Sequence, residues 1–170
     1  DATCASMSFE DWKRIMTKYN SVYSDSFIRN NTRMNQYADL FRKEVSKRPK
    51  GFSTFVFGLF SEGRVDLKYI ISGLEGLVEG KYAPKEVLRL YKAIMKKKVD
   101  DHLLFNFLRT SDYLIINKLV DIEILSYLSE FVLSHKDPIQ NFEDILMISY
   151  NSIRGIALRY VMRSSYIKSA

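Results

Sequence analysis

A chain of 170 residues can bury roughly 70% of its unfolded surface in a core, so it needs no disulfide or metal to fold. Apolar residues make up 46% and aromatic residues 14%, which excludes an intrinsically disordered protein. No apolar run approaches the roughly 20 residues that span a bilayer, and the formal net charge of +6 favours acidic partners over basic ones.

Apolar residues recur at helical spacing along most of the chain, and no alternating strand pattern or hairpin turn interrupts them. Ser8 and Asp11 form a capping pattern at the first helix, and Pro49 and Gly51 are expected to end the second. The segment 52–60 is apolar almost all round, which indicates an interior helix. The predicted helices, in chain order, span residues 8–19, 25–45, 52–60, 66–80, 84–95, 100–108, 111–120, 121–134 and 142–166.

Helix boundaries in the C-terminal half follow from proline and aspartate. Pro84 stands in the first turn of one helix, and Asp100 and Asp121 precede two others. The pair Asp137-Pro138 comes before the last helix, which is also the longest of those predicted for this half. We therefore predict an all-α fold of roughly eight to ten short helices in one domain, residues 1–170.

The sequence also aligns with itself. An offset of 73 residues pairs Phe52, Phe55, Leu59, Gly63 and Tyr69 with Leu125, Leu128, Val132, Lys136 and Phe142, without a gap. Upstream, an offset of 75 residues pairs Trp12, Ile15, Met16, Tyr19, Asp25 and Ile28 with Val87, Leu90, Tyr91, Ile94, Asp100 and Leu103. These two registers predict an internal duplication with halves at 9–80 and 84–160. Repeated helical units stack on one another and form extended surfaces.

The repeated positions carry a recognisable pattern. In the first half it comprises Pro49, Phe52, Phe55, Leu59, Gly63, Val65-Asp66 and Tyr69-Ile70. In the second half it comprises Arg109-Thr110-Ser111-Asp112-Tyr113, Leu119, Leu125, Leu128, Val132 and Phe142. This pattern resembles the insect allergen-related repeat family, which includes cockroach midgut allergens, microvillar midgut proteins and the nitrile-specifier proteins of butterflies. The resemblance implies a hollow capsule of helices whose large apolar cavity holds lipid such as fatty acids.

We therefore predict a non-enzymatic carrier that sequesters lipid or another hydrophobic small molecule in an internal apolar cavity. Aromatic and branched side chains would contact the aliphatic tail, as in most ligand pockets. The predicted lining residues are Phe52, Phe55, Leu59, Tyr69, Ile70, Leu125, Leu128, Val132 and Phe142. The competing interpretation of the same residues is an ordinary close-packed core without a cavity.

No residue pattern indicates catalysis, a metal or a cofactor. His102 and His135 stand in neither a His-x-x-x-His nor a Glu-x-x-His arrangement. Cys4 has no histidine near it in the sequence, and no phosphate-binding glycine loop or Gly-x-Ser-x-Gly motif occurs. We therefore expect no enzyme, no metal site and no cofactor.

The alternative is a basic helical module that binds an acidic protein, an anionic membrane surface or nucleic acid. Basic residues cluster at 42–50 and 96–98, and a third set shares the C-terminal helix with apolar residues. This third set predicts a basic amphipathic helix, a kind of helix that lies on membranes or on nucleic acid. Its residues are Arg154, Arg159, Arg163 and Lys168 with Ile153, Ile156, Tyr160, Val161 and Ile167. Nucleic acid is the least favoured partner, because no stacking motif accompanies the charges. Lysines at helix ends also complement the helix dipole, which is the competing interpretation of 96–98.

Location is predicted from the ends and modification motifs of the sequence. The chain begins at Asp1 rather than at Met, which fits either a processed, secreted protein or a shortened sequence, and we expect the secreted protein. The triplet Asn30-Asn31-Thr32 is a glycosylation sequon, which makes Asn30 a candidate glycosylation site. The single cysteine, Cys4, cannot form an internal disulfide and so does not report the redox compartment.

Overall fold

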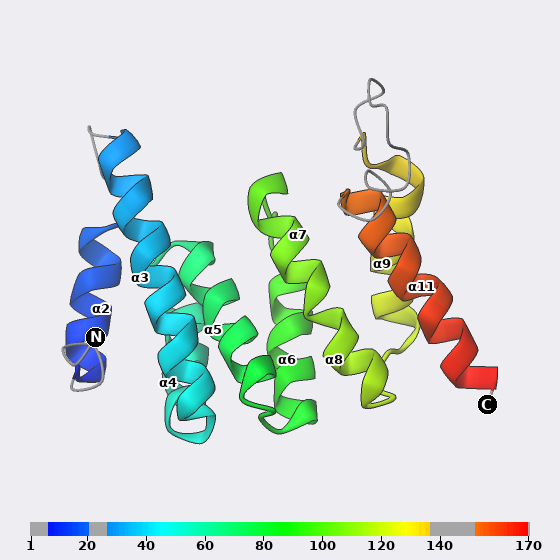
Figure 1. Ribbon diagram of the computed structural model, residues 1–170, viewed down its shortest axis with the longest axis horizontal. Coiled ribbons are helices and arrows are strands. Elements are labelled where there is room, and N and C mark those ends of the chain that lie inside the picture. The colour runs from blue at the N-terminus through cyan, green and yellow to red at the C-terminus, as the bar shows by residue number, and fades with distance from the viewer. Residues whose placement is uncertain (1–6, 21–26, 137–151, 170) are drawn as a thin grey trace. The chain divides into compact units, whose positions relative to one another are not determined.

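The computed structural model describes residues 7–20, 27–136 and 152–169 (Figure 1). These residues form helices joined by short turns and contain no strand, which confirms the predicted all-α class. The chain divides into two compact units, residues 1–83 and 84–170. Whether the two units are copies of one ancestral sequence stays a prediction.

The first unit contains four described helices, and α3 packs against each of the others. They are α2 (Phe9–Lys18), α3 (Phe27–Lys47), α4 (Pro49–Glu62) and α5 (Leu67–Glu79). The predicted cap of α2 is present: the Ser8 hydroxyl accepts a hydrogen bond from the Asp11 amide at 3.1 Å, and the Asp11 carboxylate accepts one from the Ser8 amide at 3.2 Å. This reciprocal pair satisfies two amides that a helix start otherwise leaves without partners.

The boundary between α3 and α4 differs from the prediction. Proline and glycine were expected to make a loop at 48–51, but only Arg48 separates the two helices, and α4 begins at Pro49. Proline suits a first helical position because its missing amide would have no partner there. Helix α4 ends as expected at Gly63, whose φ of 64° places it in the left-handed region that favours glycine.

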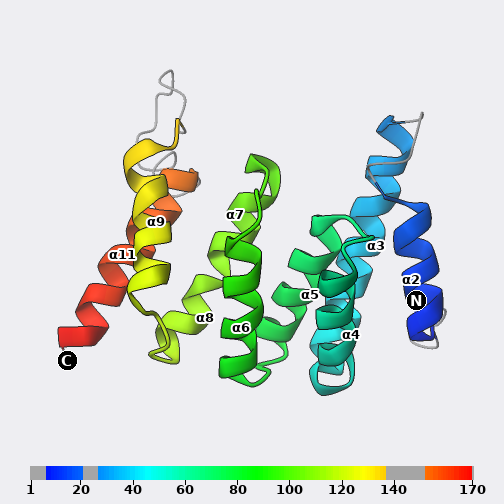
Figure 2. The same cartoon turned by 180° about the vertical axis from the view of Figure 1, so that it is seen from behind.

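Glycines on α5 allow it to lie close to α3. A Cβ atom on Gly76 would lie 2.6 Å from the carbonyl oxygen of Arg42 and 2.7 Å from Cβ of Val45. A Cβ atom on Gly80 would lie 2.7 Å from the carbonyl oxygen of Ser46. Because no side chain fits at these positions, the glycines fix how closely the two helices approach, and Figures 1 and 2 show α3 and α5 side by side.

The second unit is organised around its last helix, which packs against α7, α8 and α9, while α6 packs against α8. Its described helices are α6 (Pro84–Met95), α7 (Asp101–Arg109), α8 (Ser111–Ile116), α9 (Ile122–Ser134) and α11 (Ile153–Ser169). Helix α8 ends earlier than predicted, and Lys118 follows in the left-handed region at φ 57°. The predicted start of the last helix at residue 142 lies outside the described residues.

The core of the second unit joins α6, α7 and α8. The rings of Tyr91 and Phe107 stack with centroids 4.5 Å apart, and the Tyr91 hydroxyl is hydrogen-bonded to the Ser111 hydroxyl at 2.7 Å. Burial raises the pKa of Tyr91, so this hydroxyl stays protonated. Helix α9 begins with Asp121, whose carboxylate accepts a hydrogen bond from the Ile124 amide at 3.1 Å.

Candidate functional site

Five of the predicted cavity-lining residues belong to the first unit. Phe52, Leu59, Tyr69 and Ile70 are buried, and Phe55 is half-buried. The rings of Phe52 and Phe55 both contact Phe9, at centroid distances of 5.0 and 4.8 Å. The Tyr69 hydroxyl donates a hydrogen bond to the carbonyl oxygen of Tyr19 at 3.1 Å. Phe52, Phe55 and Tyr69 therefore contact other protein groups of the same unit.

The remaining lining residues belong to the second unit. Leu128 of α9 is buried, and Leu125 and Val132 of the same helix are half-buried. Phe142 lies outside the described residues, as does Cys4. The candidate glycosylation site Asn30 lies in α3, and its side chain is not among those described. A lipid cavity lined by these residues stays a prediction.

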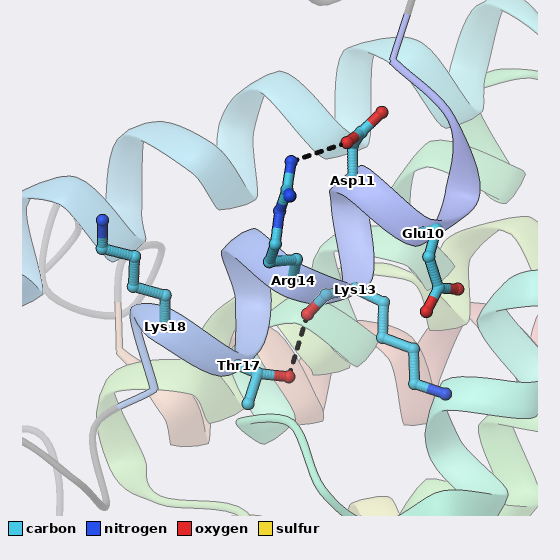
Figure 3. A pocket seen from close by; sticks show the side chains of 6 residues that line it. All are labelled: Glu10, Asp11, Lys13, Arg14, Thr17 and Lys18. Atoms are coloured by element: carbon cyan, nitrogen blue, oxygen red, sulfur yellow. Dashed lines mark hydrogen bonds and ion pairs between the residues drawn. The ribbon is translucent and has the colours of Figure 1, made fainter.

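A shallow hollow of about 500 Å³, lined by charged residues and one threonine, lies beside α2 (Figure 3). Its described lining residues, all from that helix, are Glu10, Asp11, Lys13, Arg14, Thr17 and Lys18. Arg14 forms an ion pair with Asp11 at 2.9 Å, and the Thr17 hydroxyl donates a hydrogen bond to the Lys13 carbonyl at 2.9 Å. Because these groups are partly exposed and bind one another, the hollow has the character of a solvated helix face.

The basic cluster at 42–50 is largely offset by carboxylates. Arg42 forms ion pairs with Asp39 and Glu79, and Lys43 forms one with Asp39 at 2.7 Å. In the same cluster, Glu44 forms ion pairs with Lys47 at 2.8 Å and with Arg48 at 3.2 Å. The second cluster, 96–98, is exposed and follows the C-terminal end of α6, where positive charge complements the helix dipole.

The third basic set lies on α11, and one face of this helix belongs to the core. Ile153, Ile156, Ala157, Tyr160 and Ser164 are buried against the neighbouring helices of the unit. Three of the apolar residues expected to contact a partner, Ile153, Ile156 and Tyr160, therefore hold the helix in place. Val161 is half-buried, and the side chains of Ile167 and Lys168 are not among those described.

The opposite face of α11 is apolar as well. Leu158 is 45% exposed, Met162 51% and Tyr166 74%. Successive members are four residues apart, so at about 100° per residue they form one line down the helix, on the side away from the buried residues. We call these three residues the outer stripe. It forms part of α11, which runs beside α9 in both views (Figures 1 and 2).

Arginines lie at one end of the outer stripe and along one side of it. Arg154 precedes Leu158 by four residues, at the N-terminal end of the same line, and donates a hydrogen bond from Nε to the Val132 carbonyl at 3.1 Å. Arg159 and Arg163 lie along one side: the first lies over the Tyr160 ring, and the second forms an ion pair with Asp112. All three arginines are exposed, and the sequence from 145 to 170 contains no Asp or Glu. The surface around the outer stripe is therefore both apolar and positively charged.

The periodic signal for the outer stripe was present in the sequence. Leu158, Met162 and Tyr166 have helical spacing, but so do the buried residues of the same helix. A helix with apolar residues on two faces does not reveal from sequence which face meets the core. The predicted contact residues Ile153, Ile156 and Tyr160 belong to the buried face, and the outer stripe was not predicted.

Neither a metal-binding group nor a helix able to span a membrane is present among residues 7–20, 27–136 and 152–169. Those ranges contain no group of three His, Cys, Asp or Glu side chains arranged to hold a metal ion. Nε2 of His135 lies 3.4 Å from a carboxylate oxygen of Asp101. Within the same ranges, every helix is too short or too polar to cross a bilayer.

Comparisons with protein-family models, with curated proteins and with solved structures give no match to this chain. The resemblance to the insect allergen-related repeat family therefore stays a prediction.

Proposed function

We propose that this protein is a non-enzymatic binding protein that docks on an acidic macromolecular surface through the outer stripe of α11 and the arginines beside it. The observation that carries the proposal is the combination of three exposed apolar side chains with three exposed arginines on one described helix face. A cluster of large apolar side chains exposed to solvent is typical of interaction sites.

The apolar part of the surface supplies a driving force for binding. Full burial of a leucine or methionine side chain contributes about 1.5–3 kcal/mol, and Leu158 and Met162 are each about half exposed in the unbound chain. The buried face of α11 is anchored on three other helices, so the outer stripe is presented by a helix that is already folded. Binding on a preformed helix avoids the entropic penalty of ordering a segment.

The charged part of the surface favours an acidic partner. Arg163 forms its ion pair with Asp112 at an exposed position, where such pairs contribute about 0–1 kcal/mol. A carboxylate or phosphate of a partner can therefore replace Asp112 at little loss. The absence of Asp and Glu from residues 145–170 means that no acidic residue of this segment opposes the approach of an anion.

The carrier function stays a second prediction with its own test. Organic extraction of the purified protein, followed by mass spectrometry and refilling with labelled fatty acid, measures whether lipid is held. Lipid in a near-stoichiometric amount that can be removed and replaced supports the carrier. A delipidated protein that takes up no fatty acid indicates a solid core.

The docking function is tested with a labelled acidic amphipathic peptide of leucine and glutamate, whose fluorescence anisotropy reports binding to the full chain. We expect binding that weakens as salt is added, because exposed charges are screened beyond about 10 Å at 0.1 M. We expect Met162→Ser and Arg159→Glu to weaken it and Ile122→Ser to leave it unchanged, although Ile122 is 76% exposed. α11 variants that bind as wild type does would overturn the proposal, and so would a wild-type chain that binds neither this peptide nor anionic lipid vesicles.

A further inference from the structure

We propose that the acidic surface recognised by α11 is the anionic face of a lipid membrane, on which this helix lies parallel to the bilayer plane. The inference rests on the docking function proposed above and specifies its partner. It follows from three observations about the described residues of α11: the shape of the exposed face, the position of its cations and the groups that the face lacks.

The shape of the exposed face suits a bilayer. The outer stripe extends from Leu158 to Tyr166, a rise of about 12 Å along the helix at 1.5 Å per residue. It runs down the middle of a convex helix whose other side is packed into the unit. An interfacial helix buries its apolar face about 5–10 Å into the boundary between headgroups and acyl chains. Leu158 and Met162 would enter that boundary, and Tyr166 has the amphipathic ring that is enriched at membrane interfaces.

The cations lie where lipid phosphates would be. Arg154 at the N-terminal end of the outer stripe and Arg159 and Arg163 along its side are exposed, so positive charge borders the outer stripe at one end and on one side. Long arginine side chains extend along an apolar surface while their guanidinium groups stay at the polar boundary. A guanidinium group binds phosphate oxygens through two parallel hydrogen bonds. Insertion of the outer stripe would therefore bring all three arginines to the level of the headgroups.

The same face fits other partners less well. In a nucleic-acid complex, Leu158 and Met162 would occupy the centre of the contact, where a phosphate backbone offers no apolar surface. In a dimer through α11, two faces that each carry three arginines and only one carboxylate, that of Asp112, would repel one another. An acidic protein would have to provide a groove shaped to this helix. A membrane offers an apolar interior and negatively charged headgroups. The outer stripe complements the first of these, and the arginines complement the second.

Vesicle co-sedimentation of the full chain tests the inference. The probes are vesicles of phosphatidylcholine alone and vesicles in which about a third of the lipid is phosphatidylserine. We expect at least about tenfold tighter binding to the anionic vesicles, and a loss of that difference at high salt. We expect Met162→Ser and Arg159→Glu each to weaken anionic binding about tenfold.

Two control variants test whether binding requires the outer stripe and its arginines, rather than any exposed apolar side chain or any positive charge. Ile122→Ser removes an apolar side chain that is more exposed than Met162 but lies between Asp121 and Glu123. Arg14→Glu changes the net charge as much as Arg159→Glu does, at a side chain that is 79% exposed on α2. Both are expected to bind as wild type does. Circular dichroism confirms that every variant is folded.

The outcomes distinguish this inference from the docking function beneath it. Peptide binding without vesicle binding would overturn the membrane inference and leave the docking function standing. Equal binding to neutral and anionic vesicles, or loss of binding in the control variants as large as in the α11 variants, would also overturn it. Failure of both the peptide and the vesicles to bind would overturn the docking function and the inference together.

Discussion

Helices α5 and α11 are each the last helix of their unit, and they are used differently. Helix α5 packs on α3 and α4, and α11 packs on α7, α8 and α9. Eight of the 13 residues of α5 are buried, whereas α11 exposes apolar and basic side chains along one whole face. The last helix of the first unit therefore contributes mainly to the core, whereas the last helix of the second unit also presents an exposed surface.

The residue types explain this difference. Helix α5 carries Gly73 and Gly76 on the side that meets α3 and α4, so the helix backbones approach closely there. Helix α11 carries Arg154, Arg159 and Arg163, whose guanidinium groups cannot be buried without partners. The arginines keep their side of α11 in water, and the outer stripe beside them is exposed with them.

The largest expected effect separates the two faces of α11. Ile156→Ala removes a side chain that is 1% exposed, and we expect it to lower the free energy of unfolding by about 2–5 kcal/mol. Leu158→Ala, two residues away on the outer face, should lower it by no more than about 0.5 kcal/mol. Urea unfolding of both variants measures the difference. Equal losses would show that the outer face is packed against something in the free protein.

The next effect tests the glycine contact between α3 and α5. A methyl group on Gly76 would lie 2.6 Å from the Arg42 carbonyl oxygen, so we expect Gly76→Ala to destabilise the protein by about 1–3 kcal/mol. The control is Gly58→Ala in α4, where nothing lies within 4 Å and where alanine should stabilise the helix by about 0.5–1 kcal/mol. Unfolding midpoints that shift in opposite directions are the expected result. A neutral or stabilising Gly76→Ala would contradict the close approach of the two helices.

A smaller effect is expected from the buried hydroxyl pair in the second unit. Tyr91→Phe leaves the buried Ser111 hydroxyl without its partner, which should lower the free energy of unfolding by about 1–2 kcal/mol. Tyr166→Phe removes a hydroxyl from an exposed ring on the outer stripe and should leave stability unchanged. Thermal unfolding of the two variants checks this. Equal melting temperatures would mean that the hydroxyl pair contributes nothing.

The smallest effect depends on pH. Hydrogen bonding to Lys47 is the main cause that holds the pKa of Glu44 below its ordinary value of 4.5. A carboxyl with a lowered pKa contributes stability that is present above the unfolded value and disappears as pH falls through the folded value. Glu44→Gln should therefore be less stable than wild type at neutral pH, with a difference that shrinks as pH falls below 4.5. Glu86→Gln, in the exposed pair with Arg89, is the control and should change the free energy of unfolding by only about 0–1 kcal/mol at neutral pH.

The fold could be predicted from the sequence because its helix signals are local. The cap formed by Ser8 and Asp11, the left-handed Gly63 and the first-turn Pro84 each involve residues within one turn of the helix end. The error at Pro49 has the same origin. Proline can follow the end of one helix or occupy the first turn of the next. The local sequence therefore does not determine how many residues connect the two helices.

The candidate site could not be predicted because it depends on contacts between distant residues. The inner and outer faces of α11 have equally good helical spacing, and only packing against α7, α8 and α9 decides between them. Likewise, the basic cluster at 42–50 was counted from the sequence among the charges that would bind an acidic partner. One of its counter-charges, Glu79, lies 37 residues further along the chain.

The most direct test follows the outer stripe itself. A polarity-sensitive dye is attached to Met162→Cys and, separately, to Ile122→Cys, each in a chain that also carries Cys4→Ser, and emission is recorded as anionic vesicles are added. The account predicts a shift to shorter wavelength at position 162 and none at position 122. No shift at position 162, or equal shifts at both positions, would contradict the claim that the outer face of α11 is the surface that enters the membrane.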